Sequence, residues 1–257
     1  MTAEWVAGTV RARALLNRRL GAAALRDLAA APSLAEALPA LADSPYHRYV
    51  RTDQTLSEAQ RGIGNGLLWQ LRVLAGWQPR PGAEAVRLLA GWFEADNIAQ
   101  HARRLAGFEA PAPYRLGGLA GGWPRFASTT SPAELRAGLA RSAWGDPGAD
   151  TPSAIATGVQ LSWARRVAAG VPAAAEWASG GAALLVARTR FLLGRKLTVE
   201  TAARAAEVLG RGATDATDFT GFSRQLPAAA RWSLADIADP GDLWRHSSRR
   251  PAGSPRT

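Results

Sequence analysis

The stretch Leu88-Leu-Ala-Gly-Trp-Phe-Glu-Ala-Asp-Asn-Ile-Ala-Gln-His-Ala102 decides the fold class of this chain. Its apolar residues recur every three or four positions, which places them on one face of a helix. The residues on that face are Leu88, Trp92, Ala95, Ala99 and Ala102. The stretch therefore predicts an amphipathic helix.

The same spacing recurs along most of the chain. Alternation of β-branched residues with a period of two is nearly absent, so strands have little support. We therefore expect an all-α protein that is at least about 60% helical. The other apolar stripes are Val6, Val10 and Ala14; Leu34, Leu38 and Leu41; Ile63, Leu67, Leu71 and Leu74; Ile155, Val159, Trp163 and Val167; and Trp177, Leu184, Leu185 and Phe191.

The chain is strongly basic. It holds 31 basic and 21 acidic residues for a net charge of +10, and Lys196 is its only lysine. With so many Ala, Gly and Pro residues, the arginines indicate a compositional bias and are weak evidence for nucleic-acid binding. A solvated, biased surface and a functional basic face both remain open. The absence of cysteine removes disulfides and thiolate chemistry and fits a reducing cytoplasm.

The sequence predicts neither a signal peptide nor a membrane span. The first 20 residues are rich in arginine and lack a long apolar core. The longest strongly apolar run, Ala182–Ala187, is followed directly by Arg188, whereas a bilayer span needs about 20 apolar residues.

Two segments of the chain resemble each other. Residues 33–46 and 131–144 lie 98 positions apart and share six of fourteen residues. Both begin with a serine followed three residues later by glutamate, a pattern that predicts a capping box at a helix start. Pro132 is expected at the first helical position. Farther along, Trp92 and Arg103 have the same spacing as Trp177 and Arg188.

These repeats predict a duplicated helical unit, separated by a Pro- and Gly-rich stretch at 108–124. We expect a first helical unit at 5–107, a second at 108–197 and a short third at 198–244. A basic tail without fixed structure is expected at 245–257.

The order of these motifs resembles the central-stalk coupler of A/V-type rotary ATPases, the family known as C-type in archaea and bacteria and d-type in eukaryotic V-ATPases. The resemblance covers about residues 5–195 and rests on the basic start at 10–20, the short Ser-Leu helix, the long helix that follows and the closing helix. Trp92-Phe-Glu-Ala-Asp-Asn-Ile98 followed by Arg103 carries its most specific part. The second closing helix departs from the family pattern because Gly180-Gly-Ala-Ala183 stands where an acidic residue and an Asn-Ile pair are expected.

The resemblance implies a fold and a role. The fold is a funnel of three pseudo-repeated helical units, here with a truncated third unit. The role is non-catalytic: a central-stalk subunit of a V/A-type ATPase that links the rotating axle to the ion-translocating membrane ring. Its partners would be ring and axle subunits, and it would lie in the cytoplasm, peripheral to the cell membrane. The sequence leaves open whether the ion is H⁺ or Na⁺. The alternative is a basic helical adaptor or nucleic-acid-binding protein, although no nucleic acid is expected as a partner.

No catalytic constellation stands out, so we expect no enzyme activity, no cofactor and no metal. His47 and His101 are far apart, and a helix places Glu94 and Asp96 on different sides. His101 is expected to be a satisfied surface or core histidine. We also expect Trp123 and Pro124 to prevent a helix from starting after the glycine-rich loop 117–122.

The candidate structural and interface residues follow from the motifs. Asp96 and Asn97 are expected to bond at the seam between units, and Arg103 and Arg188 to end the two closing helices. Trp92, Trp163 and Trp177 are expected in the core, whereas Trp232 and Trp244 could anchor an interface.

Overall fold

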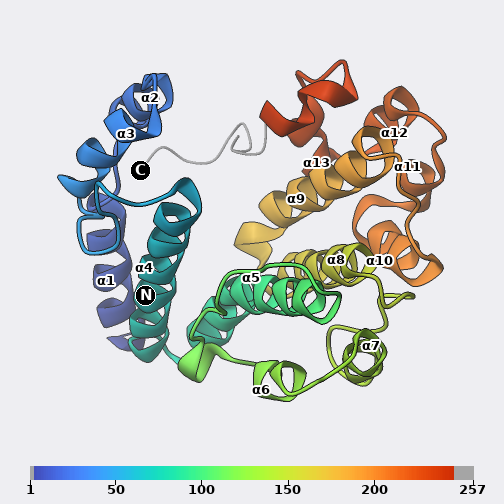
Figure 1. Cartoon of the computed structure of the whole chain (residues 1–257), viewed down its shortest axis with the longest axis horizontal. Coiled ribbons are helices and arrows are strands. Elements are labelled where there is room, and N and C mark those ends of the chain that lie inside the picture. The colour runs from blue at the N-terminus through green and yellow to red at the C-terminus, as the bar shows by residue number, and fades with distance from the viewer. Residues whose placement is uncertain (1–2, 246–257) are drawn as a thin grey trace. The chain divides into compact units, whose positions relative to one another are not determined.

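The computed structural model describes residues 3–245 of the chain. It is 71% helical, and the described residues contain no strand (Figure 1). The prediction of an all-α protein is therefore confirmed. None of the helices within residues 3–245 is long and apolar enough to cross a membrane. The side chain of Trp244 and residues 246–257, which make up nearly all of the predicted tail, lie outside the described part.

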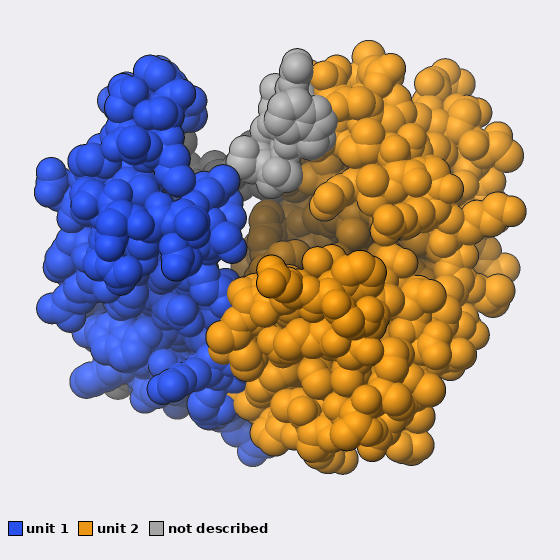
Figure 2. Space-filling view, viewed as in Figure 1, with its two compact units in different colours: residues 1–90, 114–119 blue, residues 91–113, 120–257 orange. Residues whose placement is uncertain are grey.

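The chain divides into two compact units (Figure 2). Unit 1 comprises residues 1–90 and 114–119, and unit 2 comprises residues 91–113 and the chain from residue 120 onward. The division falls inside one long helix, α5 (Arg80–Leu105), rather than in a loop. The predicted bounds 5–107, 108–197 and 198–244 stay predictions.

Unit 1 is built around a small apolar cluster. Leu38, Val50 and Ala59 are buried there, with Leu41, Tyr46 and Ile63 packed against them. Thr55 caps the long helix of this unit with a complete capping box: its hydroxyl accepts the Glu58 N–H, and the Glu58 carboxylate accepts the Thr55 N–H. The helices of unit 1 are α1 (Val6–Asn17), α2 (Ala22–Ala30), α3 (Leu34–Ala42), α4 (Leu56–Gly76) and the start of α5.

Unit 2 is organised around α8 (Pro152–Gly170), which packs against both α9 (Ala175–Ala187) and α10 (Val199–Leu209). The predicted stripe of α8 is buried, with Ile155, Val159 and Val167 almost fully inaccessible. The remaining helices of this unit are the end of α5, α6 (Trp123–Ala127), α7 (Pro132–Ala140), α11 (Arg211–Asp215), α12 (Phe219–Gln225) and α13 (Ala228–Arg231). Short 3-10 turns lie at Ala3–Trp5, Gly117–Leu119, Pro172–Ala174, Trp232–Leu234 and Pro240–Arg245.

The two repeated segments form the same local structure. Ser33 and Ser131 accept the N–H of the glutamate three residues later, at 3.3 and 3.2 Å, which starts α3 and α7. Pro132 is the first residue of α7, as predicted. The glutamates differ from the predicted capping box in both segments. The Glu36 carboxylate accepts the Ser33 hydroxyl, and the Glu134 carboxylate accepts the N–H and hydroxyl of Thr130, the residue before the cap.

The ends of the two segments also match. The Ser44 hydroxyl donates to the Leu41 carbonyl at 2.6 Å, and its oxygen accepts the Tyr46 N–H at 3.1 Å. In the second segment Ser142 makes the equivalent bonds to Leu139 at 2.7 Å and to Trp144 at 3.1 Å. A serine two residues past each helix thus fixes the turn that presents an aromatic residue.

Candidate functional site

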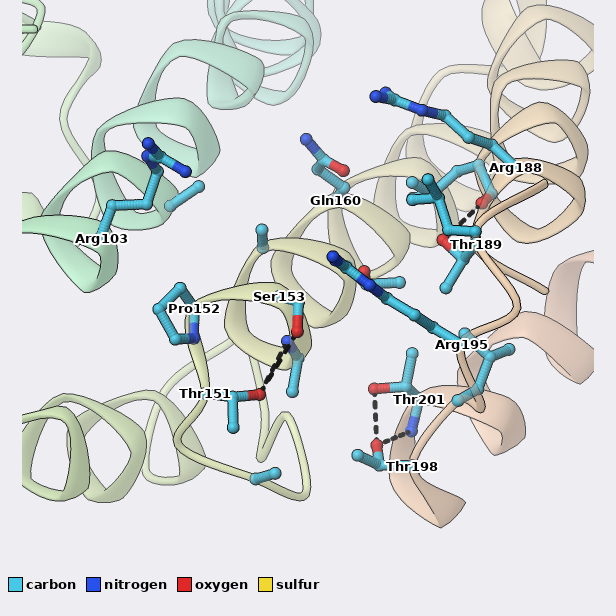
Figure 3. Close-up of a pocket in the computed structure, with 18 of the residues that line it drawn as sticks. Arg103, Thr151, Pro152, Ser153, Gln160, Arg188, Thr189, Arg195, Thr198 and Thr201 are labelled. Atoms are coloured by element: carbon cyan, nitrogen blue, oxygen red, sulfur yellow. Dashed lines mark hydrogen bonds between the residues drawn. The ribbon is translucent and has the colours of Figure 1, made fainter. Parts of the chain in front are cut away.

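Unit 2 contains a groove with a volume of about 820 Å³ (Figure 3). Three stretches of chain form its walls and floor: the last turns of α5, the first half of α8 and the end of α9 with the segment that follows it. The start of α10 completes the lining with Thr198 and Thr201.

Helical spacing places the α5 residues on one side of the groove. Asp96, Gln100 and Arg103 follow one another at intervals of four and three, so they share a helix face. The Gln100 Nε2 donates to the Asp96 Oδ1 at 3.2 Å. Arg103 lies in the last turn of the helix, and its guanidinium stands over the ring of Phe108 at 5.4 Å.

The start of α8 supplies hydroxyl and amide groups. Thr151 caps this helix by accepting the Ala154 N–H at 3.3 Å, and Pro152 is the first helical residue. Thr157 and Gln160 lie farther along the same helix and also line the groove.

The opposite wall includes Arg188, which begins a π-helical turn at Arg188–Leu192, and Arg195 and Lys196, which follow that turn. The Leu193 N–H donates to the Arg188 carbonyl, and the Arg195 N–H donates to the Thr189 carbonyl, each at 2.9 Å. Gly194 has a φ of 61°, in the left-handed region of backbone conformation that residues with a side chain rarely adopt. Arg188, Arg195 and Lys196 all line the groove.

The groove is electropositive. Among its described lining residues, Arg103, Arg188, Arg195 and Lys196 are cationic, and Asp96 alone is anionic. None of the ion pairs within residues 3–245 involves Arg188, Arg195 or Lys196. Their charge is therefore directed to solvent or to a bound group rather than to a carboxylate of the described chain.

A second polar feature of unit 2 surrounds the buried carboxylate of Glu94. Its oxygens accept the N–H groups of Gly121 and Gly122 at 2.5 and 2.7 Å and the Trp144 indole N–H at 3.4 Å. Burial lowers the pKa of nearby Arg166, while the charge of Glu94 opposes that effect. Fixed N–H donors thus take the place of water around the Glu94 carboxylate. These bonds join α5 to Gly121, Gly122 and Trp144.

This geometry corrects the prediction for the glycine-rich loop. Trp123 and Pro124 do not prevent a helix start, because α6 begins at Trp123 with Pro124 in its first turn. Proline is tolerated there because the N–H groups of a first turn have no partner within the helix. The glycines permit close approach: a Cβ on Gly121 would lie 3.1 Å from the Glu94 carboxylate.

The tryptophan predictions are partly wrong. Trp163 is buried, but Trp92 and Trp177 are 44% and 46% exposed. Both pack edge-to-face against Trp163, with ring centroids 5.1 and 5.2 Å from it. Trp163 thus covers part of the rings of Trp92 and Trp177, and the rest of each ring lies at the surface.

The other predicted residues lie apart from the groove. Asn97 is fully buried in α5. Trp232 covers Gly180 of α9 and donates its indole N–H to the Ala229 carbonyl at 3.1 Å. Its role as an interface anchor, like that of Trp244, stays a prediction. His101 is a satisfied core histidine, as predicted, because its Nε2 lies 3.0 Å from the Thr129 hydroxyl.

Sequence reasoning named Asp96, Arg103 and Arg188 without placing them in one groove. Sequence reasoning missed Arg195, Lys196 and the threonine and serine hydroxyl groups of the groove. No pattern among neighbouring residues indicates that the segment after α9 lies beside α8. Comparison with known protein families, with curated proteins and with solved structures finds no match for this chain. The fold and the site therefore define an all-helical protein with a basic groove in unit 2.

Proposed function

We propose that this chain is a non-catalytic coupling subunit of an A/V-type rotary ATPase. In that role it would transmit torque between the rotating axle and the membrane ion ring, on the cytoplasmic side of the membrane. The proposal rests on the motif resemblance over residues 5–195. The single structural observation that supports it best is the repetition of the same hydrogen bonds in segments 33–46 and 131–144.

The order of elements also supports an internal duplication. A short capped helix, a long helix and a closing helix follow one another as α3–α4–α5 and again as α7–α8–α9. Near the end of each closing helix a half-exposed tryptophan precedes an arginine by 11 residues, Arg103 in the last turn of α5 and Arg188 directly after α9. A pseudo-repeated funnel is proposed on this basis.

The physical requirements of a coupling role are stiffness and surfaces for partners. Close-packed helices deform little under load, and the buried stripe of α8 with its neighbours provides such packing. Half-exposed aromatic rings are frequent anchors at protein interfaces. Trp92 and Trp177 are therefore the proposed contacts with the ring or the axle.

The proposal is tested by ion pumping in inverted membrane vesicles from cells that lack the gene. ATP-driven ion uptake should disappear, while total ATP hydrolysis in the cell extract is retained, because coupling and not catalysis is lost. The natural chain should restore uptake. The double variant Trp92→Ala/Trp177→Ala should restore it poorly, whereas Trp69→Ala/Trp77→Ala, at two tryptophans of unit 1 that are 42% and 55% exposed, serves as the control. Undiminished ion uptake without the chain would refute the proposal.

The alternative, a basic adaptor or nucleic-acid-binding protein, is favoured by one observation, the cationic lining of the groove. It predicts salt-dependent binding of oligonucleotides by the purified chain, with affinity falling steeply as salt increases. A gel-shift titration distinguishes it from the coupling role.

A further inference from the structure

We infer that the groove of unit 2 is a binding site for a small ligand that carries two or more phosphate groups. This inference stands on the groove itself and does not depend on the proposed coupling function.

The first step of the argument is the distribution of charge. Arg103 comes from α5, Arg188 from the π-helical turn and Arg195 from the segment before α10. Figure 3 shows Arg188 and Arg195 on one side of Gln160 and Arg103 on the other. Cations from three segments that line one groove suit a ligand with several negative charges.

The second step is the chemistry of the donors. Guanidinium groups bind phosphate oxygens through paired N–H donors, and these charge-assisted hydrogen bonds are the strong ones. Neutral donors accompany them here, since Ser153, Thr157 and Gln160 line the floor of the groove. The groove also includes the first turns of α8 and α10, where the helix dipoles add positive potential.

The third step is size. Pockets for small molecules and cofactors commonly enclose about 300–1,000 Å³, and this groove has a volume of about 820 Å³. A diphosphate or a nucleotide fits this range. An acidic peptide carries its charges spread along an extended chain, about 3.3 Å per residue, and matches cations on two sides of one groove less well.

The test is isothermal titration calorimetry of the purified full-length chain at low salt, with inorganic pyrophosphate, ADP and ATP as the probes. Inorganic phosphate and vesicles with or without an anionic phospholipid form separate arms. Pyrophosphate and the nucleotides should bind, and single phosphate more weakly. Binding confined to anionic vesicles, with none to pyrophosphate, would contradict the inference, because it needs only a negatively charged surface and not a ligand with two phosphate groups.

Variants locate the binding. Arg188→Gln/Arg195→Gln should weaken pyrophosphate binding by about tenfold or more, because it removes two charge-assisted contacts. The control Arg141→Gln/Arg211→Gln makes the same change in net charge at two exposed arginines that do not line the groove. Circular dichroism and thermal melting verify that each variant folds.

Three outcomes would overturn the inference. The first is that pyrophosphate does not bind at millimolar concentration, whether or not anionic vesicles bind. The second is that the control variant weakens binding as much as the groove variant. The third is that an oligonucleotide or an acidic peptide occupies the groove and pyrophosphate does not displace it.

Discussion

The two repeated segments, residues 33–46 in unit 1 and 131–144 in unit 2, share a local framework but differ in what they support. In the first, Leu38 is buried in a small apolar cluster, and the final Tyr46 is only partly buried. In the second, the position of Leu38 is taken by Arg136, which pairs with Asp146 at 2.8 Å, and the final Trp144 is buried beside Glu94. Capping bonds therefore fix the path of the backbone, while the side chains between them decide what each copy stabilises.

The difference extends to the surroundings of each copy. Helices α1 and α2 of unit 1 bury only one residue between them, Gly8, whereas α8 and α9 of unit 2 bury long stretches of apolar side chains. Unit 2 thus holds most of the core, and substitutions in its copy are expected to have the larger effects.

The largest expected contrast is between the two final aromatic residues. Trp144→Ala should lower the free energy of unfolding by about 3–5 kcal/mol, because it empties a buried site and leaves Glu94 with one donor fewer. Tyr46→Ala should lower it by less than about 2 kcal/mol, since its ring is only partly buried. Urea denaturation followed by circular dichroism measures both. Equal losses would remove the distinction between the copies.

The second-largest effect is expected on substitution of Glu94. Glu94→Gln should destabilise the protein by about 2–3 kcal/mol, because an amide nitrogen would face a glycine N–H and the charge-assisted bonds would be lost. Glu84→Gln on the same helix is the control. It changes only an exposed pair with Arg80 and should have little effect. A small effect at Glu94 would show that the glycine loop does not depend on its carboxylate.

Two adjacent glycines test the packing of α9. A Cβ on Gly180 would overlap the ring of Trp232, whereas nothing lies within 4 Å of one on Gly181. Gly180→Ala should therefore destabilise the protein by about 1–3 kcal/mol. Gly181→Ala should stabilise it by about 0.5–1 kcal/mol, because alanine favours a helix over glycine. Thermal melting distinguishes the two, and shifts of the same sign would contradict this packing.

The two serines that end the repeated segments should behave alike. Ser44→Ala and Ser142→Ala each remove the same pair of hydrogen bonds from partly buried positions. Each should lower the free energy of unfolding by about 1 kcal/mol. Losses that differ severalfold would weaken the case that the two segments are copies of one element.

The smallest effect concerns pH. Burial lowers the pKa of His101 below its ordinary value of 6.5, and the charge of Arg104 adds to the shift. Below pH 6.5 the unfolded chain binds a proton at His101 before the folded chain does, so the free energy of unfolding falls as the pH falls. It stops falling once the pH is below the lowered pKa of His101 in the folded chain, where both forms are protonated. His101→Gln should reduce the loss of stability between pH 7 and pH 5, as measured by urea midpoints. An unchanged pH profile would mean that His101 does not contribute.

Much of the fold follows from patterns local to the sequence. The helices and the serine caps at Ser33 and Ser131 appear in the structure, because each depends on neighbours within a few residues. The stripe of α1 is wrong as a buried face, since Val6, Val10 and Ala14 are exposed. The stripes did not show how deeply Trp92 and Trp177 are buried, since that depends on how Trp163 fills the space between them.

The site was harder to predict because its residues come together through tertiary packing. Arg103 and Lys196 are 93 positions apart, and only the π-helical turn after α9 brings them to one groove. The hydrogen bonds to the buried Glu94 carboxylate were not predicted for the same reason. Its donors, Gly121 and Gly122, lie on a loop whose composition resembled a plain linker.

The central claim, that this chain is a coupling subunit of a rotary ATPase, is tested most directly by native mass spectrometry. The complex would be purified through a tag on the full-length chain from its own cells after gentle solubilisation of the membranes. The account predicts one copy of the chain in an assembly that also contains a P-loop ATPase subunit, an axle subunit and the membrane ring. A chain that purifies alone, while the intact ATPase assembles without it, would contradict the account.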